Sequence, residues 1–133
     1  MNTKIFISLP VTDVARSRSF YETLGYAENP DFSGDDTAGF IITDQIQVMM
    51  TTHAKFLQLS PKPICDPKKF TQVLLCLSLD SRQQVDDMVK KALAAGGTTF
   101  EAAEDHGFMY SHSFIDPDGH GWGLVHMTNP PPK

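Results

Sequence analysis

The chain has few basic residues and no long apolar run, and both shortages restrict its function. It carries 11 lysines and arginines against 16 acidic residues, a formal net charge of −5, with no basic stripe. Because a protein that neutralises phosphates needs a basic surface, the sequence argues against a nucleic-acid partner. No apolar run comes near the roughly 20 residues that cross a membrane. We therefore expect neither nucleic-acid nor membrane partners.

Cysteine is also scarce. The two thiols, Cys65 and Cys76, cannot make the disulfide framework of a small secreted protein, and their spacing matches no zinc-binding pattern. No signal peptide is evident, because the apolar stretch that follows Lys4 ends at Pro10. These features predict a cytoplasmic protein. The apolar run around Cys76 predicts that its thiol is buried and inert.

What the chain does have is a composition that can fold. It is 133 residues long, 41% hydrophobic and 20% charged, which suits one domain with a real core. In the first half, Asp13 is placed to cap a helix that Gly25 ends. The patterns predict a strand over 4–11, a helix over 14–24, a short strand at 26–28, and strands over 38–43 and 45–52.

The second half repeats this order after a proline- and lysine-rich arm at 53–70. Asp80 and Ser81 can cap the second helix. We take Asp80 as the counterpart of Asp13, which lies 67 residues before it, about half the chain. We expect strands over 72–79, 98–101, 108–115 and 122–127, a helix over 83–95, a loop over 102–107 and a disordered tail at 129–133. The interpretation is one domain over 1–133, with duplicated modules at 1–52 and 71–128.

Two segments carry a family resemblance. The first is Leu9-Pro10-Val11-Thr12-Asp13-Val14, followed by Ser17, Phe20-Tyr21 and Leu24-Gly25-Tyr26, and the second is Phe114-x-Asp116-Pro117-Asp118-Gly119-His120-x-Trp122. In this order and spacing, the chain resembles the vicinal oxygen chelate superfamily of glyoxalases, extradiol dioxygenases, fosfomycin resistance enzymes and bleomycin resistance proteins. The resemblance implies an α+β fold of two β-α-β-β-β modules, each curling its sheet into half a cup. It also implies a divalent metal in the cup and, commonly, a homodimer.

The metal positions that the resemblance implies carry the wrong residues here. Histidine or glutamate typically stands at four of them, and in this chain they correspond to Phe6, Met49 or its neighbour Met50, Leu74 and Gly123. None of these offers a nitrogen or carboxylate ligand, and one thioether makes no site. We therefore expect no metal and no other cofactor on a scaffold that is otherwise retained.

This combination predicts a protein that binds a small organic molecule in the cup between its modules, as bleomycin resistance proteins do. The expected lining is Phe6, Ser8, Met49, Leu74, Cys76 and Gly123. Strand alternation puts Tyr110, His112 and Phe114 on one face, so Tyr110, His112 and Trp122 are weaker candidates for an aromatic wall. The competing interpretation is that the apolar members simply fill a closed core.

Two other functions stay open. One is a metal-dependent lyase or dioxygenase with an unusual ligand set drawn from His106, His112, His126 and Glu101. The other is a regulatory or assembly module whose own side chains fill the cup. The sequence identifies neither the ligand nor any catalytic activity, and it does not say whether the modules pair within one chain or across a dimer.

Overall fold

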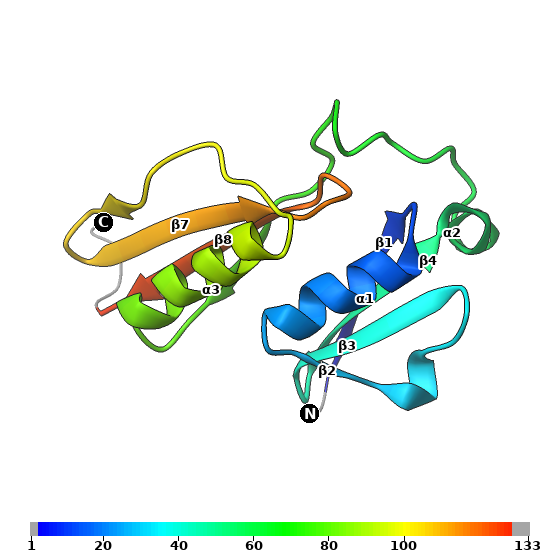
Figure 1. Ribbon diagram of the computed structural model, residues 1–133, viewed down its shortest axis with the longest axis horizontal. Helices are drawn as coiled ribbons and strands as arrows, with labels where there is room; N and C mark the ends of the chain where they lie inside the picture. The colour runs from blue at the N-terminus through cyan, green and yellow to red at the C-terminus, as the bar shows by residue number, and fades with distance from the viewer. Residues whose placement is uncertain (1–2, 129–133) are drawn as a thin grey trace. The chain divides into compact units, whose positions relative to one another are not determined.

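The computed structural model describes residues 3–128. It divides into two compact units with the boundary between Asp66 and Pro67, and each unit has its own four-stranded sheet and a long helix (Figure 1). The tail predicted to be disordered, 129–133, lies outside the described residues. In the described part of the chain, no helix is both long and apolar enough to cross a membrane.

The first unit follows the predicted order. Its sheet has the strand order β1-β4-β3-β2, with β1 parallel to β4. Asp13 caps α1, since its Oδ1 accepts a hydrogen bond from the Arg16 N–H at 3.1 Å, and Gly25 follows the helix with a φ of 102°. The elements are β1 (Ile5–Val11), α1 (Val14–Thr23), β2 (Ala27–Glu28), the 3-10 helix η1 (Pro30–Phe32), β3 (Thr37–Thr43), β4 (Ile46–Thr52) and α2 (His53–Leu59).

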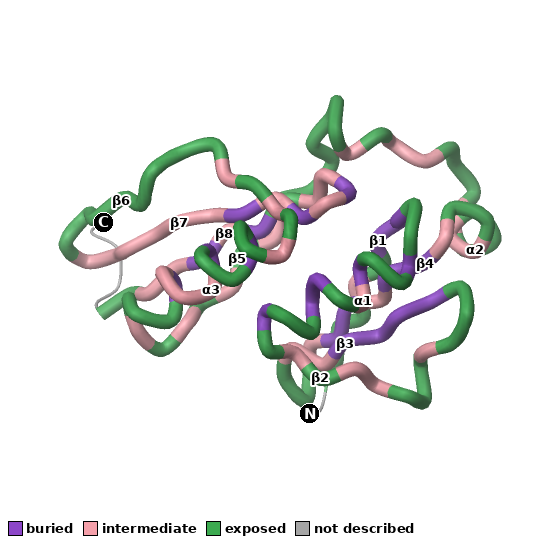
Figure 2. The backbone as a smooth tube through the Cα atoms, viewed as in Figure 1, coloured by how far each residue is buried: buried purple, intermediate pink, exposed green. Residues whose placement is uncertain are grey.

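The core of the first unit lies between α1 and one face of this sheet. Phe20 and Tyr21 of α1 are buried against Phe40 and Val48, and the Tyr21 and Phe40 rings are 5.9 Å apart. Burial of each large apolar side chain contributes roughly 1.5–3 kcal/mol. Figure 2 shows the buried stretches of this unit in α1, β1, β3 and β4.

The second unit repeats the first. Its sheet has the order β5-β8-β7-β6, with β5 parallel to β8, so the same topology occurs twice. This confirms the α+β class and the two β-α-β-β-β modules. Val85 and Val89 of α3 lie in its core with Phe114, Trp122 and Leu124. The elements are β5 (Leu75–Ser78), α3 (Arg82–Ala94), β6 (Glu104–Asp105), β7 (Met109–Ile115) and β8 (Gly121–Met127).

Several element predictions in the second unit are wrong. The strand predicted over 72–79 is only Leu75–Ser78, because its partner β8 begins at Gly121 and the residues before Gly121 form a turn. Instead of a strand over 98–101 there is one bridge between Thr98 and Ile115. The short strand β6 falls inside the predicted loop over 102–107, where it pairs with β7.

Two local signals were also misjudged. Ser81, not Asp80, caps α3: the Ser81 Oγ accepts from the Gln84 N–H at 3.1 Å. The Asp80 N–H instead donates to the Gln84 Oε1. The arm predicted as a linker begins with a helix, α2, because the Thr52 Oγ1 accepts from the Lys55 N–H and provides its cap.

The prediction of a buried Cys76 is wrong as well. The side chains of β5 alternate between half-buried and exposed, and Cys76 is among the exposed ones. An apolar run predicts burial on both faces of a strand. β5 lies at the edge of its sheet, and α3 covers only the face to which Leu75 and Leu77 belong.

Candidate functional site

Each sheet has one face packed against its helix and a second face turned away from it, which we call the distal face. Strand pairing assigns the side chains, because residues opposite each other in register share a face and neighbours along a strand alternate. The Phe40 ring packs on Tyr21 of α1, so the residues next to it along β3 belong to the distal face. The distal face of unit 1 consists of Phe6, Ser8, Pro10, Thr37, Gly39, Ile41, Gln47, Met49 and Thr51.

An aromatic cluster lies on this distal face. Phe6 is 48% exposed, and its ring meets that of Phe32 edge-on at 5.6 Å between centroids. Phe32 comes from η1, which folds back over the sheet. A Cβ at Gly39 would lie 3.2 Å from both the Phe32 Cβ and the Met49 Sδ, so only glycine leaves room for this contact. We call Phe6, Phe32 and Met49 the aromatic pad.

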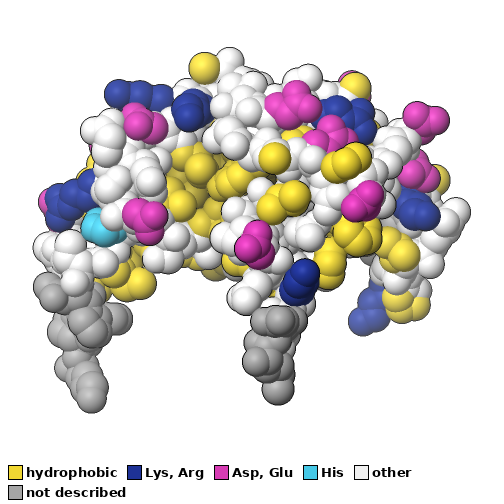
Figure 3. All heavy atoms as spheres, turned by 90° about the horizontal axis from the view of Figure 1, so that it is seen from below, with side chains coloured by type: hydrophobic (Ala, Val, Ile, Leu, Met, Phe, Trp, Pro, Cys, Tyr) yellow, Lys and Arg dark blue, Asp and Glu magenta, His cyan; other side chains and the backbone are white. Residues whose placement is uncertain are grey.

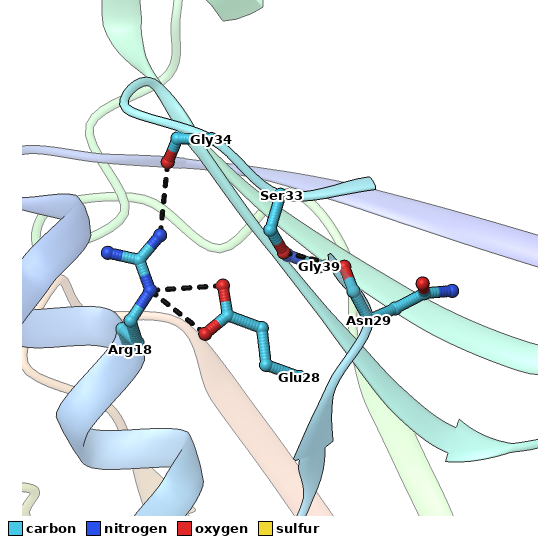
Figure 4. Close-up of polar contacts among 6 residues, drawn as sticks. All are labelled: Arg18, Glu28, Asn29, Ser33, Gly34 and Gly39. Atoms are coloured by element: carbon cyan, nitrogen blue, oxygen red, sulfur yellow. Dashed lines mark hydrogen bonds and ion pairs between the residues drawn. The ribbon is translucent and has the colours of Figure 1, made fainter. Parts of the chain in front are cut away.

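The segment that carries Phe32 is fixed by short hydrogen bonds. The Asn29 side chain caps η1 by accepting from the Asp31 N–H at 3.0 Å, and its Nδ2 donates to the Gln47 Oε1 at 3.1 Å. The Ser33 Oγ donates to the Asn29 carbonyl at 2.8 Å and accepts from the Gly39 N–H at 3.0 Å. These bonds join the segment to β3 and β4, and Figure 4 shows Ser33 between Asn29 and Gly39.

An ion pair holds the same segment from the helix side. The Arg18 Nε of α1 lies 3.0 Å from both carboxylate oxygens of Glu28, and its Nη2 donates to the Gly34 carbonyl at 3.0 Å (Figure 4). Because Glu28 and Gly34 flank η1, Arg18 ties both of its ends to α1. A shallow pocket lies over this contact, lined by Arg18, Glu28, Pro30, Ser33 and Gly34.

The distal face of unit 2 is built from smaller side chains. Cys76, Gly123 and Ser113 form one row across β5, β8 and β7. A Cβ at Gly123 would lie 3.5 Å from the Cys76 Sγ, an ordinary van der Waals contact. Although Cys76 is exposed as a residue, neighbouring atoms partly shield its sulfur from water, and this desolvation raises the pKa of the thiol, so the thiol is neutral near pH 7. The Ser113 Oγ is buried without a hydrogen-bond partner among the described residues.

The structure does not bring every predicted lining residue to the distal faces. Phe6, Ser8 and Met49 share the distal face of unit 1, and Cys76 and Gly123 share that of unit 2. Leu74 precedes β5 and is 84% exposed.

The three weaker candidates lie on the face of unit 2 that packs against α3. The Tyr110 hydroxyl donates to the Asp86 Oδ1 of α3 at 2.6 Å, the His112 Nε2 lies 2.9 Å from the Glu101 carbonyl, and Trp122 is 2% exposed. His112 does share a face with Tyr110 and Phe114, as the alternation predicted. That face is opposite to the one that holds Gly123, so the three do not form a wall beside it.

The residues present do not fit the divalent metal that the fold implies. A phenylalanine, a methionine, a leucine and a glycine supply no nitrogen or oxygen ligand from their side chains. The alternative histidines have other neighbours: His106 Nε2 lies 2.9 Å from a Glu104 oxygen, and His126 Nδ1 lies 2.9 Å from the Leu79 carbonyl. Across residues 3–128, no group of three or more His, Cys, Asp or Glu side chains is placed to hold a metal ion.

Sequence reasoning missed the segment that completes the aromatic pad. The patterns predict no element between residues 28 and 38, and they give no role to Phe32, Arg18 or Gln47. Two signals were available in the sequence. A single large aromatic residue stands in that polar stretch, and Gly39 interrupts an apolar strand, which often marks a close backbone approach.

Comparison with known proteins finds one family model and several solved structures that resemble this chain. Residues 3–42 match the family model described as bleomycin resistance protein-like N-terminal. No curated protein matches the chain. Among solved structures, the hypothetical protein SA1046 from S. aureus is 25% identical, with a TM-score of 0.79 and coverage of 95% of this chain and 94% of that one.

Two further solved structures are named as a family enzyme and as a resistance protein. A glyoxalase/bleomycin resistance protein/dioxygenase family enzyme from Burkholderia phytofirmans PsJN is 19% identical, has a TM-score of 0.74, and the match covers 92% of this chain and 96% of that one. The fosfomycin resistance protein FosX from Listeria monocytogenes is also 19% identical, with a TM-score of 0.67, and the match covers 99% of this chain and 96% of that one. At this identity the likeness is one of fold.

Proposed function

The chain is a member of the vicinal oxygen chelate superfamily, and from this premise we propose that it binds a small organic molecule without a metal ion. The proposed site is the distal face of unit 1, with the aromatic pad as its centre. In this proposal the protein holds its ligand and performs no chemistry on it. The bleomycin resistance proteins of the same superfamily are the nearest functional analogy.

One observation carries the proposal: a partly exposed pair of aromatic rings stands where the resemblance implies a metal ligand. Phe6 occupies the first of those positions and is half exposed, and it packs against Phe32 rather than into the core. Partly exposed aromatic side chains that are held rigidly are suited to contact a ligand. A structural core residue would instead be covered, as Phe40 is on the other face of the same sheet.

The lack of an evident acid, base or metal is consistent with this function. Sequestration requires ligand affinity alone, whereas catalysis requires groups that bind the transition state more tightly than the substrate. The distal face of unit 1 offers hydroxyl, amide and thioether groups beside its phenyl rings, and all of these are uncharged near neutral pH. Such a surface supports binding.

Two measurements on the full chain test the proposal. The first is metal content after the purified protein has been offered Ni²⁺, Zn²⁺, Mn²⁺ and Fe²⁺ in turn and excess ion has been removed. The second is a thermal-shift screen of small organic molecules in the presence of EDTA. We expect no stoichiometric metal and at least one stabilising compound. One tight metal ion per chain or per dimer would overturn the proposal and favour a lyase or dioxygenase.

A matched pair of variants locates any compound that binds. Ser8→Trp adds an indole to the distal face beside Met49, its partner in register. Ala15→Trp adds the same ring to the exposed side of α1. We expect Ser8→Trp to abolish the thermal shift that the compound produces and Ala15→Trp to retain it. Equal shifts in both variants would place the ligand elsewhere and contradict the site.

We also propose that the protein is a homodimer, as the resemblance implies. Among residues 3–128, β1 and β5 each lie at the end of their sheet, and a strand at a sheet edge can pair with a further strand. Such edges favour further association with another strand. Sedimentation equilibrium of the untagged chain tests this, and a monomer at micromolar concentration would contradict it.

A further inference from the structure

The distal faces of both units are free of charge along their long strands. Strands β1, β3 and β4 contribute no ionisable side chain to the distal face of unit 1. Strands β5, β7 and β8 contribute only Cys76, whose thiol is neutral near pH 7. Glu104 of the short edge strand β6 shares that side, and it is paired with His106.

This distribution stands out against the rest of the chain. The sequence has 27 lysine, arginine, aspartate and glutamate residues, and Figure 3 shows such side chains spread over the surface on one side of the molecule. A charged ligand that is taken out of water without an opposite charge loses its hydration with no compensation. Strands β1, β3 and β4 offer no such partner, and the one charged side chain of η1 is the acidic Asp31. The charge character of this face therefore favours an uncharged ligand.

The shape of the aromatic pad favours a planar ligand. The Phe6 and Phe32 rings meet at an interplanar angle of 62°, and both phenyl groups are close to half exposed. Met49 lies at the foot of the pair, with its Sδ within 3.2 Å of the position of a Gly39 Cβ. Aromatic rings and thioether sulfur both make favourable contacts with a further aromatic ring.

A polar group stands beside the pad. Gln47 is the register partner of Phe6, and its side chain is held by the Asn29 amide at 3.1 Å. Two amides placed side by side offer both hydrogen-bond donors and acceptors. Gln47 is 8% exposed, so its side chain forms a neutral polar floor next to Phe6 that is fixed in place by Asn29. This arrangement suits a neutral ring.

The pad is also held rigid before any ligand arrives. Arg18 ties both flanks of η1 to α1, and Ser33 ties the segment to Asn29 and to the Gly39 N–H. Rigid placement reduces the entropy that is lost when a ligand orders its site. Arg18 is therefore a positioning residue: it lies on the helix side of the sheet and acts on the pad through the segment that carries Phe32.

We infer that the distal face of unit 1 selects an uncharged, planar aromatic molecule, which packs on Phe6 and Phe32. This inference rests on the proposed function, because it names the class of ligand for that site. It excludes anionic ligands such as phosphonates and carboxylates from the same face.

Three small organic probes test the inference by isothermal titration on the full chain with EDTA present. Coumarin is planar, aromatic and neutral, coumarin-3-carboxylate adds a negative charge to the same ring, and cyclohexanone is neutral without an aromatic ring. We expect coumarin to bind at least tenfold more tightly than either of the others. Tighter binding of the carboxylate or of cyclohexanone, or no binding of coumarin, overturns the inference.

Variants show whether coumarin uses the pad. Phe32→Leu keeps an apolar side chain and removes the ring, and we expect at least a fivefold loss of coumarin affinity. Phe100→Leu makes the same change at a side chain of unit 2 that is 71% exposed, and we expect no change. Arg18→Ala should lower the affinity for coumarin as Phe32→Leu does, while the circular dichroism spectrum stays that of the parent chain. Equal affinities in all three variants overturn the inference.

The outcomes separate this inference from the proposed function. If the carboxylate or cyclohexanone binds and Ser8→Trp blocks it, the site stands and the ligand class is wrong. If no probe binds and the chain takes up a metal ion, the proposed function itself fails. If Phe32→Leu changes the sedimentation of the chain and not its affinity for coumarin, the pad covers a second copy instead, and the inference is overturned.

Discussion

The Tyr110 hydroxyl donates a hydrogen bond of 2.6 Å to the Asp86 Oδ1, and so joins the start of β7 to the helix that covers it. The Arg82 guanidinium lies 5.1 Å from the centre of the same ring and forms a bidentate contact with Asp105, at 2.7 and 3.0 Å. A residue first considered for ligand binding thus fastens α3, β6 and β7 of unit 2 together.

Removal of this hydrogen bond should weaken unit 2. Tyr110→Phe keeps the ring beneath Arg82 and deletes only the hydroxyl, and we expect it to lower the free energy of unfolding by about 1 kcal/mol. Urea denaturation measures the change. A double-mutant cycle with Asp86→Ala isolates the contact, and strictly additive effects of the two substitutions would contradict a direct interaction.

Removal of a hydroxyl that is buried without a hydrogen-bond partner should not lower the stability of the fold. Thr51 is 2% exposed, and its Oγ1 has no hydrogen-bond partner among residues 3–128. Thr51→Val replaces this hydroxyl by a methyl group of similar shape, so it should leave the midpoint of urea denaturation unchanged or raise it. Thr52→Val is the control, because the Thr52 hydroxyl caps α2 and its loss should cost about 1 kcal/mol. A lower midpoint for Thr51→Val would show a partner that we have not identified.

The contact of Gly39 with Phe32 gives a prediction that does not depend on any ligand. A Cβ on residue 39 would lie 3.1 Å from the Phe32 carbonyl oxygen, a backbone atom that cannot easily move away. Gly39→Ala should therefore lower the free energy of unfolding by about 1–3 kcal/mol and move the Phe32 ring away from Phe6. NMR ring-current shifts of the Phe6 and Phe32 protons report the movement. Gly34→Ala is the control, since nothing lies within 4 Å of its Cβ position.

Stability at high pH should depend on Tyr26. Burial raises the pKa of Tyr26 from 10.0 to about 12, because the ionised phenolate would lose its hydration. Since the pKa is higher in the folded state, the folded chain is favoured below pH 10, and this advantage is lost as the pH rises through 12. The loss is roughly 2–3 kcal/mol, since each pKa unit corresponds to about 1.4 kcal/mol. Denaturation between pH 8 and 12 measures it, and Tyr26→Phe should flatten the profile. Equal slopes in both proteins would contradict the assignment.

The duplicated modules were predictable because they rest on local patterns. Asp13 and Gly25 bound a helix by their own chemistry, and the alternating side chains around Phe114 define a strand whatever packs on it. The edges of the second sheet were not predictable in this way. The length of β5 depends on where its partner β8 begins, and a pattern within one strand holds no information about its neighbour.

The candidate site was predicted in part, for a similar reason. Phe6, Ser8 and Met49 could be placed on one face from the resemblance together with strand alternation. Phe32 could not, because no local rule says over which face of a sheet a polar loop will fold. The same limit explains why Tyr110, His112 and Trp122 were expected beside the ligand. Strand alternation correctly predicts which side chains share a face, but it does not say which face the helix covers.

All the strand pairings described here stay within one unit, and no paired residues are more than about 50 positions apart in the chain. Each half can therefore assemble from nearby segments without waiting for the other, which keeps the entropy of loop closure small and favours rapid folding. A chain emerging from the ribosome could complete the first sheet while the second half is still being synthesised. Nascent chains that end just after the arm should already protect the amides of β3 and β4 from hydrogen exchange.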